Sequence, residues 1–550
     1  MLRNCNAAGV LIAGGVILSL VGGGVARANA TTGPVLEATV TDGASIGKPA
    51  PAKAGAVVKT SIKPVRATAV VWIDAAGDDA RATALIEALE ASGAHALPQG
   101  KYPVGELRAA LEAAKAGDPA AVSAMETAFR KALLDYARDV SSGLLEPRTI
   151  DRDLHVFPDR PEPADVIARY ASADDPAAFL ASLAPSGEDY ERLQAELADL
   201  SALAPGSWGE RVQAGRSIRP GERNARLAMV RARLQAMGDY TPAVEVEDQV
   251  AYDFELEQAV RAFQRRHGLN DDGVIGKRTV AAMNVEPEER LGQVVVNLER
   301  LRWLNRDLGV RRIMVNQADY NVKLIDNGVV LFDERVVIGK ARKHRTPEFS
   351  DMMSYLVFNP TWHVPRSIAS KEILPLLQED PEYLSKKNMR LLTRGGEAAP
   401  DPTLTDWSLY SANDFPYVIK QRPGGGNALG RVKFMFPNQF NIYLHDTPSK
   451  RLFKKDARAF SHGCVRVQDP LRLAELLIEP QKAGASSYID GVLGRGKERS
   501  VKLSEPVPVH LTYRTAWVDD AGVRQFRSDV YGRDARVLSA LQAAGVVLSN

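Results

Sequence analysis

Cysteine is scarce in this chain of 550 residues, which contains only Cys5 and Cys464. Cys5 lies in an N-terminal segment that we expect to be removed, so one thiol remains in the mature chain. A single cysteine cannot build an internal disulfide framework. Cys464 is therefore expected to be free for chemistry or for an intermolecular bond.

An excess of charge of one sign is also lacking. Lys and Arg number 70 and Asp and Glu number 68, which leaves a formal net charge of +2. Proteins that bind nucleic acid use positive charge to neutralise phosphates, so this balance argues against nucleic acid as a partner. Because 45% of the residues are hydrophobic, the chain is expected to form soluble globular domains. Its length predicts about three of them.

Residues 1–30 have the pattern of a secretory signal peptide. Arg3 precedes an apolar run at 7–25, and Ala28-Asn29-Ala30 offers small residues for cleavage. We expect cleavage after that triplet and a body that lies outside the cytoplasm. The alternative is an uncleaved inner-membrane anchor, because the run is just long enough to span a bilayer. Residues 31–67 lack sustained periodicity, which predicts a flexible linker.

Residues 68–219 lack any grouping of side chains that is typical of catalysis. Their apolar residues recur at helical spacing, as in the stripe formed by Met125, Phe129, Leu133 and Tyr136. Aromatic and Met side chains at that spacing indicate packing in a core rather than a cofactor site. We therefore expect a mainly helical N-terminal scaffold domain.

Residues 220–288 carry a compact helical pattern. Apolar side chains at 256, 259, 260 and 263 share one face of an expected helix that Gly268 can end. The turn Asp271-Asp272-Gly273 leads to a short second helix, and a helix ending at Gly238 precedes both. This stretch resembles the small three-helix peptidoglycan-binding domain, through its AVRAFQRRHGL helix followed by DGVIG and a threonine. The resemblance implies that this segment binds peptidoglycan. Two alternatives stay open, namely that the segment is an unrelated helical hairpin or that it is a binding module that serves only as a spacer.

Beyond residue 290 the pattern changes to strands. β-Branched residues alternate or cluster at 312–316, 320–325 and 334–339, and Asp326-Asn327-Gly328 is a hairpin signal between the last two. We expect an antiparallel sheet. Together with the helical domains before it, this sheet predicts the α+β class.

The surroundings of Cys464 are typical of a nucleophile. It lies in Ser461-His462-Gly463-Cys464-Val465-Arg466, and His445 precedes it by nineteen positions. A free thiol is mostly protonated near neutral pH unless an imidazole or backbone amides stabilise the thiolate. Gly463 allows close approach of a ligand, and the polar neighbours are unusual for a core cysteine. An alternative is a zinc site of His445, His462 and Cys464, although no fourth ligand is evident.

Residues 290–550 resemble the L,D-transpeptidases, a family of peptidoglycan cross-linking enzymes with a β-rich catalytic domain. The resemblance rests on the spacing between His445 and the cysteine hexapeptide and on several further stretches. These are Val337-Ile338-Gly339-Lys340, Thr346-Pro347, Asn359-Pro360-Thr361-Trp362-His363-Val364-Pro365 and Leu444-His445-Asp446-Thr447-Pro448. The resemblance implies a catalytic domain at 289–550 of the large, multidomain type.

In that type of protein a further segment is inserted into the catalytic domain, and residues 366–430 fit it. Residues 370–377 and 381–392 look helical, Pro375 should kink or shorten the first helix, and 423–427 is expected to be a flexible return. The glycine run in that return lacks the Lys and Ser or Thr of a phosphate-binding loop. We expect a helical capping subdomain that acts as a lid.

The resemblance also implies roles for residues of this sequence. Cys464 is the nucleophile and His445 the general base, whose ring we expect the Asp446 carbonyl to orient, with the Asp446 side chain as the alternative. Backbone amides of His462, Gly463 and Cys464 are expected to bind the oxyanion, and the His462 side chain to position substrate. The expected substrate-binding residues are Tyr443, Arg466, Trp362, His363 and Asp446. No metal or other cofactor is implied.

The reaction of the family follows as an expectation. The thiolate attacks the diaminopimelate carbonyl of a tetrapeptide stem, releases D-Ala and forms a thioester, which the diaminopimelate amine of a second stem resolves into a cross-link. Water as acceptor would give an L,D-carboxypeptidase and a lipoprotein lysine an anchoring transferase. A non-catalytic wall-binding scaffold is the remaining alternative. The family also implies a periplasmic location, stem peptides and glycan as ligands, and acylation by carbapenems.

Overall fold

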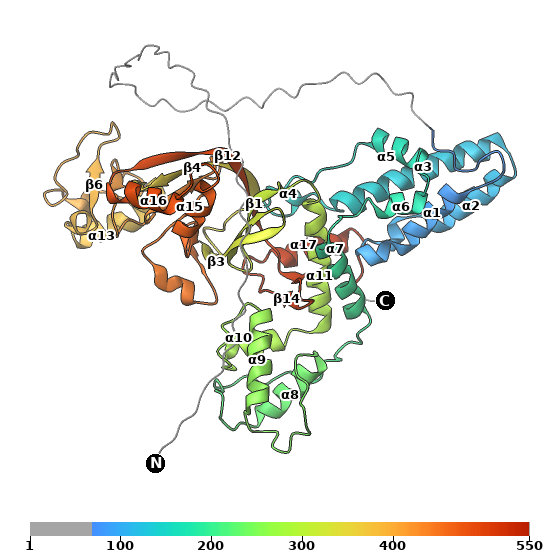
Figure 1. Ribbon diagram of the computed structural model, residues 1–550, viewed down its shortest axis with the longest axis horizontal. Helices are drawn as coiled ribbons and strands as arrows, with labels where there is room; N and C mark the ends of the chain where they lie inside the picture. The colour runs from blue at the N-terminus through green and yellow to red at the C-terminus, as the bar shows by residue number, and fades with distance from the viewer. Residues whose placement is uncertain (1–68, 549–550) are drawn as a thin grey trace, which may run out of the picture. The chain divides into compact units, whose positions relative to one another are not determined.

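A computed structural model describes residues 69–548, and the expected signal peptide and linker at 1–67 lie outside the described residues. The described part has a helical N-terminal region, a small helical domain and a β-rich C-terminal region (Figure 1). The α+β class predicted from the sequence is confirmed. Within residues 69–548, no helix is both long enough and apolar enough to cross a membrane.

The N-terminal region is built from helices. They are α1 (Ala80–Glu90), α2 (Val104–Lys115), α3 (Pro119–Ser142), α4 (Pro147–Ile150), α5 (Pro163–Ala171), α6 (Pro176–Ala181) and α7 (Glu188–Ser201). The Asp118 side chain accepts hydrogen bonds from the first backbone amides of α3, and Pro119 opens that helix. The predicted stripe at 125, 129, 133 and 136 is buried along α3, in the core between these helices.

The small helical domain contains α8 (Arg226–Ala236), α9 (Phe254–Arg266) and α10 (Lys277–Met283). The predicted apolar face of α9 is buried, and Gly268 follows the helix with a φ of +63°. Buried Gln264 accepts a hydrogen bond from Gly273 N–H and donates one to the Val274 carbonyl. The glutamine of the AVRAFQRRHGL helix therefore holds the turn that follows it.

A long helix that the sequence analysis missed comes next. α11 (Pro287–Trp303) buries Leu291, Val294, Val295 and Leu298 and fills the stretch before the first predicted strand, which is present as β1 (Arg311–Asn316). These apolar positions have helical spacing, which was a readable signal. α11 packs against α7 and against α17 (Arg533–Ala543).

The β-rich C-terminal region is organised around one nine-stranded sheet. In spatial order it runs β10-β3-β11-β9-β8-β4-β12-β1-β2, and β2 also pairs with β3, so the sheet closes on itself. Its strands are β1 (Arg311–Asn316), β2 (Asn321–Asp326), β3 (Val329–Gly339), β4 (Phe349–Phe358), β8 (Val432–Met435), β9 (Leu444–His445), β10 (Ala459–Ser461), β11 (Val465–Val467) and β12 (Arg499–Thr512).

The sheet is mixed, which corrects the expectation of an antiparallel one. The β2–β3 hairpin is present, and Asn327 and Gly328 both have positive φ in its turn. However, β1 pairs with β12, β3 with β10 and β9 with β11 in parallel. Each parallel pair joins strands that are not consecutive in the chain. The local residue pattern carries no information on the direction of such pairings.

The inserted subdomain is not purely helical. Its helical segments are α12 (Arg366–Ile368), a π-helix (Ala369–Ile373), α13 (Leu374–Glu379) and α14 (Tyr383–Lys386). Residues 389–392, predicted as helix, form strand β6 (Met389–Leu392) of a three-stranded sheet with β5 (Trp362–His363) and β7 (Val418–Gln421). Pairing with β7 decides this assignment, and β7 lies far along the chain.

Two details of the insertion involve single residues. Pro375 lies in the first turn of α13, directly after the π-helix, where it needs no backbone N–H. Asn427 ends the predicted flexible return, but it is buried, and its side-chain amide donates to the Pro360 and Arg422 carbonyls. The return is therefore fixed at this end.

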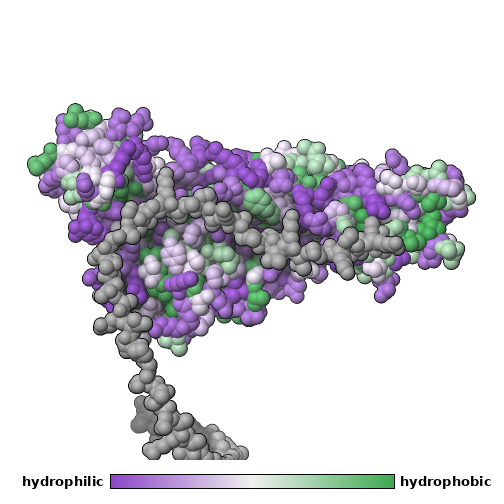
Figure 2. Space-filling view, turned by 90° about the horizontal axis from the view of Figure 1, so that it is seen from above, coloured by the Kyte–Doolittle hydropathy of each residue, from purple (hydrophilic) through white to green (hydrophobic). Residues whose placement is uncertain are grey.

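On the face shown in Figure 2 the surface is mainly hydrophilic, with apolar residues in scattered groups.

Candidate active site

Two adjacent strands bring the predicted nucleophile and base to one face of the sheet. β9 and β11 are parallel, with His445 opposite Arg466 and Leu444 opposite Val465. Leu444 and Val465 are fully buried in the core of the sheet, so His445 and Arg466 point to the other face. The Val465 N–H donates to the Tyr443 carbonyl, which extends the pairing by one residue. Cys464 and Tyr443 therefore share the face of His445 and Arg466.

The turn that presents Cys464 is closed by a serine. Ser461 Oγ donates to the Cys464 carbonyl at 2.6 Å and accepts from Gly463 N–H at 3.1 Å. Gly463 has a φ of +116°, and a Cβ there would lie 2.9 Å from the side chain of Ile442. Since Ser461 takes the Gly463 N–H, that amide is not aimed at an oxyanion as predicted.

His445 is buried and has a defined tautomer. Its Nδ1 lies 2.5 Å from the Asp446 carbonyl oxygen, which can only accept, so the proton is on Nδ1 and the Nε2 lone pair is available. Burial, together with the positive charge of Arg466, lowers the pKa of His445 to about 3. The imidazole is therefore neutral at physiological pH.

Cys464 is half-buried, and its Sγ lies 3.7 Å from the Asn441 carbonyl. Burial raises the pKa of the Cys464 thiol, while a hydrogen bond with the Tyr443 backbone and the charges of Lys433 and Arg466 oppose that rise. The net direction is upward. In the resting protein this favours a thiol beside a neutral imidazole over the thiolate expected from the sequence.

Lys433 is a site residue that the sequence analysis missed. It lies on β8 opposite His445, and its Nζ is 3.7 Å from the centre of the Tyr443 ring. Burial lowers the pKa of Lys433, and the Cys464 thiolate would raise it. The alternation of Lys433 with buried Val432 and Phe434 was a signal that its side chain leaves the core.

Arg466 presents an incompletely paired guanidinium to the same face. Within residues 69–548, its buried Nε has no hydrogen-bond partner. Burial lowers the pKa of Arg466, and the interaction with Cys464 raises it. A buried cation without a protein partner is costly unless a ligand completes it.

Asp446 is placed differently from the prediction that it contacts substrate or orients His445 by its side chain. The carboxylate is buried and accepts hydrogen bonds from Arg431 N–H at 2.8 Å, from Thr447 N–H at 2.7 Å and from Lys450 Nζ at 2.6 Å. Through these three hydrogen bonds the Asp446 carboxylate fixes the backbone after β9. Only the backbone carbonyl of Asp446 reaches the imidazole.

The other predicted residues belong to the border with the inserted subdomain. Trp362 is half-buried and packs against the small core of that subdomain, and His363 is exposed beside Lys420 of β7. His462 Nε2 lies 2.6 Å from Glu372 Oε1 in the π-helix. The alternative zinc set is not gathered among residues 69–548, because the cluster of potential ligands that includes His462 is completed by His344 and Glu372 and not by His445 or Cys464.

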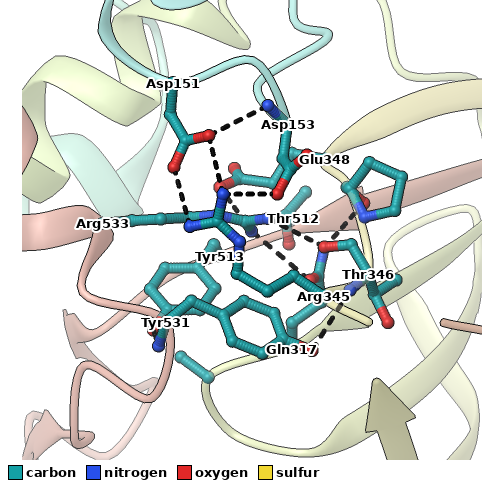
Figure 3. Close-up of polar contacts among 12 residues, drawn as sticks. Asp151, Asp153, Gln317, Arg345, Thr346, Glu348, Thr512, Tyr513, Tyr531 and Arg533 are labelled. Carbon is teal, nitrogen blue, oxygen red and sulfur yellow. Dashed lines mark hydrogen bonds and ion pairs between the residues drawn. The ribbon is translucent and has the colours of Figure 1, made fainter. Parts of the chain in front are cut away.

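A network of polar contacts that includes Thr346, Arg345 and Arg533 (Figure 3) extends to the turn that holds Cys464. Thr346 Oγ1 donates to the Gly463 carbonyl at 2.7 Å and accepts from Gly339 N–H at 3.0 Å. The Thr346 carbonyl in turn accepts from Arg533 of α17 at 2.8 Å. Thr346-Pro347 is one of the stretches that carry the family resemblance, but its residue types alone indicated no role.

The same network reaches the helical N-terminal region. Asp151, just after α4, pairs with both terminal nitrogens of Arg345 at 3.0 and 3.1 Å. Arg536 of α17 also bonds to Asp151, and Arg533 pairs with Glu348 at 3.0 Å. Residues from three distant parts of the chain thus hold the segment that bonds to Gly463.

Comparison with known proteins matches three parts of the chain to described domains. Residues 310–485 match the family described as L,D-transpeptidase catalytic domain. Residues 65–197 match a scaffold domain, and residues 223–283 match a domain described as "Putative peptidoglycan binding domain". The region that holds His445 and Cys464 therefore lies within the match to the L,D-transpeptidase catalytic domain. It is joined in one chain to a peptidoglycan-binding domain.

Individual relatives cover parts of the chain. A protein of Haemophilus influenzae named "Putative L,D-transpeptidase" is 34% identical over 225 residues, which are 41% of this chain and 45% of that protein. The chain thus spans less than half of that relative's length. The N-acetylmuramoyl-L-alanine amidase CwlM of Mycobacterium tuberculosis is 39% identical over 85 residues, 14% of this chain and 20% of its own. A solved L,D-transpeptidase of Xylanimonas cellulosilytica covers 54% of this chain and 98% of its own at 13% identity and a TM-score of 0.17.

Proposed function

We propose that this protein is a peptidoglycan L,D-transpeptidase that works outside the cytoplasm and forms cross-links between stem peptides. The observation that carries the proposal is the pair His445 and Cys464 on one sheet face, within the region matched to the catalytic domain. The peptidoglycan-binding domain at 223–283 supports the wall as the substrate. The proposed donor is a tetrapeptide stem that ends in diaminopimelate and D-Ala.

The first half of the reaction transfers the acyl group to sulfur. Cys464 Sγ attacks the diaminopimelate carbonyl carbon while His445 Nε2 accepts the thiol proton, which a neutral imidazole can do. The tetrahedral intermediate then expels the D-Ala nitrogen, and His445 returns the proton to this leaving amine. The products are free D-Ala and a thioester on Cys464.

The second half resolves the thioester. The side-chain amine of a second stem's diaminopimelate attacks the thioester carbonyl, His445 accepts a proton from that amine, and the sulfur leaves and is reprotonated. Water in place of the amine would make the protein an L,D-carboxypeptidase, and a lipoprotein lysine would make it an anchoring transferase. The wall-binding domain and the inserted subdomain favour cross-linking between stems.

The proton transfer is proposed to accompany attack. The raised pKa of Cys464 and the lowered pKa of His445 both disfavour a preformed thiolate and imidazolium pair. We propose that the backbone N–H of Cys464 donates a hydrogen bond to the oxyanion, because the Gly463 N–H is already bonded to Ser461 Oγ.

The cations of the site suit the carboxylates of a stem peptide. Lys433 and Arg466 border Cys464, and Arg466 has an unpaired Nε within the described chain. Guanidinium and ammonium groups bind carboxylates by charge-assisted hydrogen bonds. We propose that these two side chains, with Tyr443 directly before β9, hold the donor stem.

Intact-mass spectrometry tests the proposal. The full chain is incubated with a tetrapeptide muropeptide or with a carbapenem, which mimics the acyl donor. We expect a covalent adduct, released D-Ala and muropeptide dimers, all absent in Cys464→Ala. Because general acid–base catalysis typically contributes about 10²–10⁴-fold, His445→Gln should slow adduct formation by that factor.

The outcomes separate the alternatives. An adduct that persists in Cys464→Ala contradicts the assigned nucleophile. D-Ala release without dimers indicates a carboxypeptidase, and binding to isolated cell walls without any D-Ala release indicates a non-catalytic scaffold.

A further inference from the structure

Three side chains converge beside the proposed active site, and only His462 has an expected role there, in positioning substrate. His344, Glu372 and His462 each offer one ligand atom, and these atoms lie within 4.8 Å of one another. His462 Nε2 is 2.6 Å from Glu372 Oε1, and the rings of His344 and His462 have centres 4.5 Å apart. The group is partly exposed, so a solute can reach it.

The three residues come from separate segments. His344 lies in the loop between β3 and β4, Glu372 in the π-helix of the inserted subdomain, and His462 in the turn between β10 and Cys464. A ligand bound by all three would join the inserted subdomain to the catalytic turn. The present contact between His462 and Glu372 already forms half of that link.

The donor set matches a borderline transition-metal ion. Two imidazole nitrogens and one carboxylate oxygen are typical protein ligands of zinc, with a fourth position left for water. Tetrahedral bonds of about 2.0–2.1 Å place ligand atoms about 3.4 Å apart, so the present cluster needs only small side-chain shifts. Magnesium and calcium prefer oxygen ligands and fit this set poorly.

Charged side chains of both signs lie around the cluster. Lys340 and Lys343 contribute positive charge near the cluster, and Glu372 offsets it.

We propose that His344, Glu372 and His462 form a binding site for a divalent ion of the zinc class, which couples the inserted subdomain to the catalytic turn and slows acylation. Ion binding itself is independent of the reaction; the inhibitory effect rests on the proposed transpeptidase function. The physical reason is that His462 precedes Cys464 by two residues. An ion that fixes His462 and Glu372 together restricts the turn and the insertion that must admit the stem peptide.

Isothermal titration calorimetry with zinc chloride tests binding. The full chain carrying both Cys5→Ser and Cys464→Ala has no thiol as a competing ligand and should bind one zinc ion, but not magnesium or calcium. Adding His344→Ala or Glu372→Gln to that chain should weaken zinc binding at least about tenfold, because each removes a ligand. Lys343→Ala, which removes a neighbouring positive charge and no ligand, should bind zinc at least as tightly as the parent.

Acylation kinetics test the coupling. In the chain with Cys464 intact, carbapenem acylation should slow as zinc is added, with half-inhibition at the dissociation constant from calorimetry. His344→Ala should acylate at the normal rate without zinc and lose most of the inhibition.

Any one of three results would overturn the inference. The first is the absence of zinc binding to the chain with Cys5→Ser and Cys464→Ala. The second is unchanged zinc affinity after His344→Ala and Glu372→Gln, in chains whose circular dichroism shows a normal fold, and the third is zinc binding without any effect on acylation. Failure of the transpeptidase proposal would appear instead as no acylation in zinc-free protein, with calorimetric binding unaffected.

Discussion

At the scale of single residues, the site depends on how a few polar groups are paired. A backbone carbonyl, and not a carboxylate, sets the tautomer of His445. The Asp446 carboxylate instead accepts hydrogen bonds from three nearby donors. Lys433 and Arg466 supply positive charge beside Cys464. The reactivity of the thiol therefore reflects a balance between burial, which raises its pKa, and these cations, which lower it.

This balance predicts the pH dependence of alkylation. In a Cys5→Ser chain, iodoacetamide should modify Cys464 at a rate that rises with pH and reaches half-maximum above the ordinary cysteine value of about 8.5. Lys433→Met removes a cation that lowers the pKa, so the half-maximum should move up by about one pH unit. Lys323→Met, on the distant strand β2, is the control and should leave the profile unchanged. A rate that is already maximal at pH 7 would contradict a thiol resting state.

At the scale of elements, the turn from β10 to β11 matters most. Ser461 closes it, Gly463 gives it a φ that other residues rarely adopt, and Thr346 bonds to it from the neighbouring loop. The turn is thereby held in one conformation before substrate arrives. Such preorganisation is expected where a nucleophile must meet a carbonyl carbon in a defined geometry.

Gly463→Ala tests the strain in this turn. The new Cβ would lie 2.9 Å from the side chain of Ile442, and the alanine would have to adopt a backbone φ of +116°. We therefore expect a loss of about 1–3 kcal/mol in the free energy of unfolding. Acylation of Cys464 should fall as well. Gly426→Ala is the matched control, because its Cβ meets nothing within 4 Å and urea unfolding should hardly change. Equal effects of the two substitutions would remove the argument for a strained turn.

At the scale of the whole molecule, the helical N-terminal region takes part in supporting the active site. Asp151 pairs with Arg345 in the loop before β4 and with Arg536 in α17, and Arg533 bonds to the Thr346 carbonyl (Figure 3). This chain of contacts ends at the Gly463 carbonyl. A change in the N-terminal region can therefore alter the catalytic turn without touching substrate.

Asp151→Asn tests that support. Removing one partner of a buried ion pair leaves the others unpaired, so we expect a loss of about 3 kcal/mol in the free energy of unfolding in urea at pH 7. Asp159→Asn in the same segment is exposed and should change it by less than about 0.5 kcal/mol. Acylation should slow only in the first variant. Equal stability of both variants would contradict a supporting role.

The pH dependence of that loss has a definite sign. Burial raises the pKa of Asp151, but the backbone hydrogen bond from Asp153 and the charges of Arg345, Arg533 and Arg536 outweigh it, so the pKa is lowered. A lowered pKa contributes stability above the unfolded-state value of about 3.9. This contribution disappears as the pH falls through the folded-state pKa. The difference between wild type and Asp151→Asn should therefore shrink below about pH 4.

Short-range patterns in the sequence predicted a large part of this architecture. The buried stripe of α3, the end of α9 at Gly268 and the Asn327-Gly328 hairpin all depend on a few neighbouring residues. Strand β6 was missed because its partner β7 lies far along the chain, and the parallel strand pairs were missed for the same reason. Lys433 was missed because it joins the site across a strand pairing.

By itself, the sequence determined the residue types of the chemistry, the order of the domains and the local turns, since spacing along the chain carries all three. Only the tertiary structure decided that the Asp446 carboxylate is withdrawn from the site, that Gly463 is braced by Thr346, and that His462 faces His344 and Glu372. These facts depend on which distant segments meet. Burial and long-range strand pairing govern that meeting, and neither can be read from neighbouring residues.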